Sequence, residues 1–86
     1  MPRISEFYGI AIYVYWRDHS PPHFHAIYGG DDAAIDIASG NVLEGQLPRG
    51  AARMVKVWCD AHRDELFDNW ARAQRGEPLI PVAPLD

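Results

Sequence analysis

The chain has 86 residues, of which 48% are hydrophobic and 12% aromatic, and its formal net charge is −4 at pH 7. This length predicts a single domain, residues 1–86, with one modest core, and the composition excludes intrinsic disorder. The negative charge argues against a protein that binds nucleic acid mainly by electrostatics. Cys59 is the only cysteine, and no run has the apolar length of a signal peptide or a membrane span. We therefore expect a soluble cytoplasmic protein with no membrane partner.

The first half of the chain alternates between apolar and polar residues, as strands do. In the run YGIAIYVYW, Ile12, Val14 and Trp16 share one face, which we expect to be the core side. Tyr13 and Tyr15 share the other face. The prolines of RDHSPP then interrupt the pattern, because proline cannot donate a hydrogen bond to a neighbouring strand.

The run HFHAIYGGDDAAIDIASGN predicts a hairpin with residues 29–32 as its turn. A symmetric register around that turn pairs Phe24 with Ile37 on the core side, and His25 with Asp36 on the other face. A slip of one residue would place Asp36 among the core side chains, which supports this register.

Two weaker signals complete the strand-rich part, 3–47. The segment 3–8 is a candidate edge strand, and VLEGQL is a candidate last strand that Gly45 weakens. The predicted sheet is therefore a four- to five-stranded antiparallel meander.

From Pro48 the hydrophobic period changes to that of a helix, over residues 48–75. Phe67 lies on the polar side of the helix, so we expect a bend or break between residues 59 and 63, with Asp60 as the cap of the second half. The apolar stripe consists of Ala51, Val55, Trp58, His62, Leu66, Trp70 and Ala73.

The last segment, 77–86, has three prolines among apolar residues and cannot be helical. It predicts an extended arm that docks on its own domain or on a partner, after a helix that ends at Gly76. The fold class is therefore α+β: an antiparallel meander followed by one kinked helix or two helices, packed on one face of the sheet.

The strand assignments place His23 and His25 on the face turned away from the core, together with Tyr13, Tyr15 and Asp36. Imidazoles, phenols and a carboxylate above small alanines are typical of a shallow site. Three interpretations of this face remain open.

In the first interpretation the histidines hold a divalent metal. Residues at i and i+2 of a strand lie roughly 6.5–7 Å apart, which suits two imidazoles on one ion. His23, His25 and Asp36 would be ligands, and His19 would reach in from the loop. No fourth firm ligand or cysteine pair completes a structural zinc site.

In the second interpretation the face carries out acid–base chemistry on RNA without a cofactor. His25 would be the general base, oriented by Asp36, and His23 would be the acid. Tyr13 or Tyr15 would contact the substrate. The candidates for phosphate binding are Arg17, Arg49, Arg53 and Lys56.

In the third interpretation the histidines end a loop or form an interface with another protein, as polar–aromatic sheet faces often do. A core of this size leaves little stability to spare, so a partner chain or a homo-oligomer would help. The row of Arg49, Arg53 and Lys56 is then an ordinary solvated helix face. Trp58, Trp70 and Cys59 are expected in the core, and His62 is expected to be a core histidine with a hydrogen-bond partner.

Three segments of the chain resemble one known family. YGIAIYVYWRDHSPPHFHAIYGG, IDIASGNVLEGQLP and AHRDELFDNWARAQRGEPLIPVAPL resemble the small bacterial proteins grouped as domain of unknown function 4160. The most specific element is PPHFH after an aromatic strand, with a histidine before ELFDNW. The positions that match the family signature are Pro21, Pro22, His23, His25, His62 and Trp70.

This resemblance implies a strand-rich first half, a helical second half and no settled activity. The genes of such proteins often lie beside that of another small protein, an arrangement similar to toxin–antitoxin pairs. It therefore implies a small cognate protein partner. From this resemblance and the histidine face, we expect the protein to be a toxin-like component that acts on RNA. The alternatives are a non-catalytic binding module and a small metal-binding protein.

Overall fold

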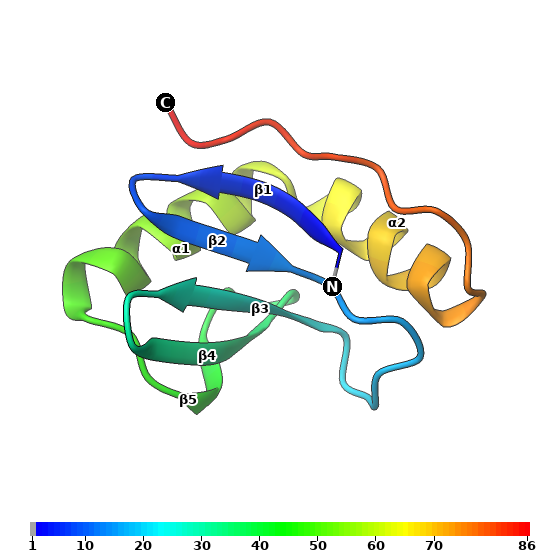
Figure 1. Cartoon of the computed structure of the whole chain (residues 1–86), viewed down its shortest axis with the longest axis horizontal. Coiled ribbons are helices and arrows are strands. Elements are labelled where there is room, and N and C mark those ends of the chain that lie inside the picture. Colours follow the sequence, from blue (N-terminus) through cyan, green and yellow to red (C-terminus); the bar gives the residue numbers. More distant parts are fainter. Residues whose placement is uncertain (1) are drawn as a thin grey trace.

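The computed structural model describes residues 2–86, and its five strands precede two helices (Figure 1). The strands form one sheet in the order β1-β2-β3-β4-β5, and every neighbouring pair is antiparallel. The predicted α+β meander followed by two helices is therefore confirmed. The elements are β1 Arg3–Phe7, β2 Ile10–Tyr13, β3 His23–Tyr28, β4 Asp31–Asp36, β5 Val42–Gly45, α1 Arg49–Ala61 and α2 Arg63–Gln74.

The core lies between the sheet and the helices, and α1 passes behind the sheet in Figure 1. Trp58 of α1 is fully buried, and its ring centroid lies 5.2 Å from that of Phe7 and 5.6 Å from that of Phe24. Cys59 beside it is also buried, as expected. Because side chains alternate along a strand, the neighbours of Phe24 on β3, His23 and His25, lie on the opposite face of the sheet.

The β3–β4 hairpin is tighter than predicted. Its turn is the two-residue Gly29-Gly30, and Gly29 has a φ of 58°. Two-residue turns with positive φ suit the twist of the flanking strands. The register therefore pairs Phe24 with Ile35 and His23 with Asp36, so the predicted pairing of His25 with Asp36 is wrong. The shift is an even number of residues, which leaves the prediction of each face intact.

Strand β2 is shorter than the alternating run suggested. Val14 is buried as predicted, but Trp16 is 46% exposed, and its Nε1 donates to the backbone oxygen of Glu77, 3.1 Å away. The prediction that Trp16 points into the core is wrong. The chain leaves the sheet after Tyr13, and Arg17 has a φ of 55°, so strand alternation no longer applies there.

The predicted helix break occurs at His62, which separates α1 from α2. Asp60 does not cap α2: it lies inside the last turn of α1, where its backbone is helical, and its carboxylate binds Arg63. Asp64 and Glu65 occupy the first turn of α2 as expected. Neither helix within residues 2–86 is long and apolar enough to cross a membrane.

The C-terminal arm docks on its own domain. Gly76, with a φ of 70°, ends the helical region, and Figure 1 shows the chain returning past α2 toward β1. The backbone N–H of Val82 donates to the oxygen of Ile4 at 2.8 Å. The indole of Trp58 donates to the oxygen of Ala83, also at 2.8 Å. These contacts cover the β1 edge of the sheet, which would otherwise present unpaired backbone groups.

Candidate metal centre

The loop between β2 and β3, residues 14–22, carries Asp18 to the histidines. The end of α2 holds this loop: the backbone N–H of Arg17 donates to the oxygen of Ala73 at 3.2 Å. The side-chain amide of Gln74 donates to the backbone oxygen of Asp18 at 3.1 Å. The helix thereby sets where the Asp18 carboxylate lies.

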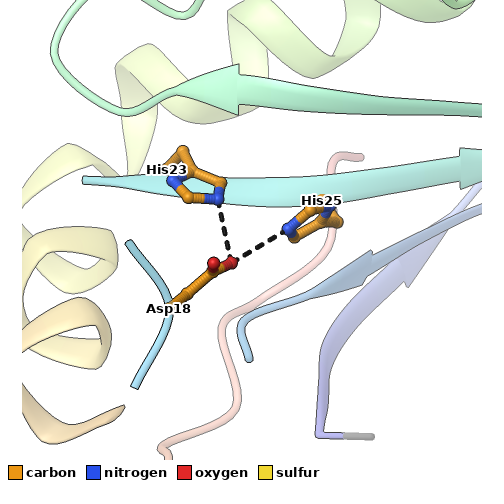
Figure 2. A group of neighbouring side chains, drawn as sticks. All are labelled: Asp18, His23 and His25. Carbon is orange, nitrogen blue, oxygen red and sulfur yellow. Dashed lines mark hydrogen bonds and ion pairs between the residues drawn. The ribbon is translucent and has the colours of Figure 1, made fainter. Parts of the chain in front are cut away.

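Asp18, His23 and His25 form one compact cluster (Figure 2). Oδ2 of Asp18 lies 2.9 Å from Nε2 of His23 and 3.2 Å from Nε2 of His25. One ligand atom from each residue lies within 4.8 Å of the others. Two imidazoles and one carboxylate oxygen therefore point at one small volume.

His23 is the most constrained member, with only 3% of its side chain exposed. Its Nδ1 lies 2.7 Å from the backbone oxygen of Pro21, which can only accept, so Nδ1 must carry a proton. In a neutral imidazole Nε2 then has a lone pair, and this lone pair faces the Asp18 carboxylate. Two acceptors at 2.9 Å need a cation between or beside them: a second proton on the ring, or a metal ion.

Asp18 is held as an anion. Burial raises the pKa of its carboxyl group. The hydrogen bonds from the backbone N–H of His19 and from His25, with the nearby charges of His23 and His19, outweigh burial and lower the pKa below its ordinary value. The carboxylate therefore stays charged and available to a cation throughout the neutral range.

His25 is the accessible member of the cluster, with 20% of its side chain exposed. Tyr13 pairs with it across β2 and β3, and the ring of Tyr15 lies 4.4 Å from its ring centroid. Burial, Asp32, Tyr13 and Asp18 raise the pKa of the Tyr15 phenol, so Tyr15 stays neutral. The prediction that Tyr13 and Tyr15 share the histidine face is confirmed.

Asp36 does not contact His25, although we predicted that it would orient that histidine or bind a metal beside it. Its Oδ2 accepts from the backbone N–H of Ser39 at 3.1 Å and from the Ser39 hydroxyl at 2.7 Å. It thus stabilises the turn after β4 and does not orient His25. The carboxylate at the histidines is Asp18, which the sequence analysis missed because the path of the 14–22 loop is not encoded in a local pattern. The signal that could have found it is the acid in DHSPPHFH, in the same segment as three histidines.

His19 lies at the rim of the cluster. Its side chain is 79% exposed, and its Nδ1 is 2.9 Å from Oδ1 of Asp18, the oxygen that does not face His23 and His25. It therefore contacts the same carboxylate without joining the group of three ligand atoms.

The predicted phosphate-binding arginines do not meet the histidines. The Arg17 guanidinium lies against Gly76, at the end of the helical region. Arg49 and Arg53 belong to α1, which packs on the other face of the sheet.

The remaining signature positions fall into two groups. Pro21 supplies the carbonyl for His23, Pro22 accepts from the backbone N–H of Ile37 at 3.2 Å, and Trp70 packs 5.2 Å from the His23 ring. These three hold or cover His23. His62 lies elsewhere: its Nδ1 is 2.7 Å from Glu65 and its ring packs near Trp58. It has a partner as expected, but with 19% of its side chain exposed it lies at the edge of the core.

Fold and cluster together define a small α+β protein whose sheet packs helices on one face and carries a two-histidine, one-carboxylate cluster on the other. The chain belongs to the family described as domain of unknown function DUF4160, whose family model matches residues 9–71. The matched segment contains Asp18, His23 and His25. No curated protein matches the chain, and no solved structure matches it.

Proposed function

We propose that this protein binds one divalent transition-metal ion through Asp18, His23 and His25. The observation that carries the proposal is the hydrogen bond between Nδ1 of His23 and the oxygen of Pro21, because it turns the lone pair of Nε2 toward a carboxylate. Histidines that bind metals usually donate their other ring N–H to a carbonyl or carboxylate in this way. Imidazole and carboxylate ligands suit zinc, iron, nickel and copper.

Three protein ligands leave coordination positions free, and metal sites that do chemistry keep such a position for water or substrate. A bound ion there would polarise a substrate oxygen or supply an activated water. Within this chain, Asp18, His23 and His25 would hold the ion, and Trp70 with the 14–22 loop shields His23 from water. His25 forms the accessible side of the centre.

Metal content tests this proposal directly. The full chain, purified without a histidine tag, is analysed for metals and then titrated with zinc, iron(II), nickel and copper by calorimetry. We expect about one ion per chain for at least one metal. Asp18→Asn and His23→Ala should weaken its affinity at least tenfold, because each removes a ligand.

Two variants serve as controls in that titration. Asp36→Asn and His19→Ala should bind the metal nearly as the natural chain does, because neither side chain belongs to the three-ligand group. A natural chain that takes up no stoichiometric metal near pH 7.5 would refute the proposal, as would an Asp18→Asn variant of unchanged affinity.

A second candidate function is the metal-free acid–base chemistry of a toxin-like protein. It is supported by His25, which is partly exposed and oriented by a carboxylate, Asp18, at 3.2 Å. The buried His23 is a poor partner acid, because only 3% of its side chain is exposed and it shares the same carboxylate oxygen. For this reason the geometry favours the metal.

Growth of the expressing cells tests the second candidate. A toxin-like protein should arrest growth when expressed alone, and co-expression of the neighbouring gene should relieve the arrest. His25→Ala should also relieve it while the protein stays folded. Harmless expression, or toxicity that His25→Ala leaves unchanged, contradicts this function.

A further inference from the structure

A hollow opens beside the proposed metal centre on the exposed face of the sheet. It has a volume of about 330 Å³ and is lined by His19, Pro21, His23, His25, Ala34, Leu43 and Glu44. A second hollow of about 230 Å³ shares His25, Ala34 and Glu44 with the first and adds Asp32 and Gly45. The two hollows therefore adjoin at these three residues, and together they are called the depression.

The sheet register explains this depression. His25 pairs with Ala34, and Ala34 pairs with Glu44, so the three lie in one row across β3, β4 and β5. Ala34 is the smallest member and forms the floor between an imidazole and a carboxylate. A ligand in the depression would thus contact His25 on one side and Glu44 on the other.

The charge of this depression is negative. Asp32 and Glu44 line it, and Oδ1 of Asp32 lies 4.0 Å from Nδ1 of His25. Among residues 2–86, no lysine or arginine lines either hollow. Arg3 lies on β1 at the edge of the same face, and its Nη1 forms an ion pair with Oε1 of Glu6 at 2.7 Å. The Arg17 guanidinium lies against Gly76.

We propose that this depression binds a small organic cation, an ammonium or guanidinium compound with an apolar stem, and not a phosphate group. The inference rests on the metal centre proposed above. A divalent ion and the Asp18 carboxylate would together carry one positive charge. Asp32 and Glu44 carry two negative charges, so the metal centre and the depression together would have a net charge of −1. Leu43, half exposed, and Pro21 supply apolar contacts for the stem. Phosphate groups are usually recognised by arginine or lysine donors, and this depression has none among the described residues 2–86.

The test is an NMR titration of the zinc-loaded full chain at low ionic strength, with agmatine and inorganic phosphate as separate probes. Agmatine should cause saturable shifts in the amides of Ala34 and Glu44, which belong to no metal ligand, and phosphate should not. The double variant Asp32→Asn/Glu44→Gln should weaken agmatine binding about fivefold or more, as expected for two partly exposed ion pairs. Its zinc affinity should fall far less than that of Asp18→Asn, because neither side chain belongs to the three-ligand group.

A matched variant, Glu6→Gln/Asp68→Asn, makes the same change in net charge away from the depression and should bind agmatine as the natural chain does. Three results would overturn the inference: agmatine shifts that spread over the acidic surface without saturation, equal weakening by both double variants, or phosphate binding at these amides as tightly as agmatine. If zinc binds and agmatine does not, the inference fails and the metal centre stands. If no zinc binds but the metal-free chain takes up agmatine with the predicted shifts, the metal centre fails and the preference for a cation stands.

Discussion

Asp18 contacts three histidines with one carboxylate, and this makes it the residue on which the site depends. Oδ2 faces His23 and His25, and Oδ1 faces His19. Its pKa in the folded chain is lowered, because the histidine contacts outweigh the opposing effect of burial. A carboxyl group whose pKa falls on folding stabilises the folded state above its unfolded pKa of about 3.9. That contribution is lost as the pH falls through the folded pKa.

Asp18→Asn should therefore destabilise the metal-free protein in a pH-dependent way. In the presence of EDTA at pH 7 we expect a loss of about 1.5–3 kcal/mol in the free energy of unfolding, the usual range for hydrogen bonds to a charged group. The difference between the natural chain and the variant should shrink below about pH 4. Urea unfolding at pH 7, 5, 4 and 3 measures it. A difference that stays constant down to pH 3 would contradict the role given to the charge.

Two of the three residues in the Asp18–His23–His25 cluster could be predicted from the sequence. His23 and His25 follow from strand alternation alone, since both lie on the face opposite Phe24. Asp36 was the wrong carboxylate, because a hairpin turn two residues shorter than predicted moved it opposite His23, where it binds Ser39. Asp18 lies in a loop whose path depends on contacts with α2.

Among the elements, α2 links the arm to the site. Asn69 of α2 is 1% exposed, and its amide donates to the oxygen of Ile80 and accepts from the N–H of Ile80, both at 2.8 Å. The last turns of the same helix hold Arg17 and Asp18. One helix therefore fixes the C-terminal arm on one side and the 14–22 loop on the other.

Asn69→Ala should loosen the arm. It leaves the backbone N–H and oxygen of Ile80 without partners beside a buried position, which costs about 1–3 kcal/mol. We expect faster amide hydrogen exchange at Ile80 and Val82 and a lower free energy of unfolding. Asp68→Ala, a change at the exposed neighbouring position, should affect both measurements far less. Unchanged exchange at Val82 in Asn69→Ala would show that the arm is held by other contacts.

The position of the helix break follows from hydrophobic periodicity, but its capping residue does not. The off-stripe Phe67 correctly indicated an interruption between residues 59 and 63, and the structure breaks at His62. The capping residue was wrong, because Asp60 is still inside α1. Hydrophobic periodicity locates a break to within a few residues but does not decide which residue leaves the helical conformation.

For the whole molecule, the cluster joins parts that are distant in sequence: the 14–22 loop, strand β3 and, through Trp70, helix α2. An ion bound by Asp18, His23 and His25 would therefore stabilise the folded chain and not the unfolded one. At a hundredfold excess over the dissociation constant the gain is about 2.7 kcal/mol. A domain of this size converts that gain into a rise in Tm of about 10–20 °C.

Calorimetric melting with the bound metal and with EDTA tests this linkage. The natural chain and Asp36→Asn should both show the rise in Tm, whereas Asp18→Asn should lose most of it. Equal melting temperatures with metal and with EDTA would mean that the ion does not bind the folded cluster.

The meander, the helical second half and the face on which the two histidines lie can all be predicted from the amino-acid sequence, because hydrophobic period and proline or glycine turns are local properties. The even register shift did not disturb the face, since strand alternation repeats every two residues. The identity of the carboxylate that meets the histidines depends on long-range contacts in the folded chain. The position of Asp18 depends on hydrogen bonds to Ala73 and Gln74, more than fifty residues further along the chain, and no local pattern encodes contacts between such distant parts.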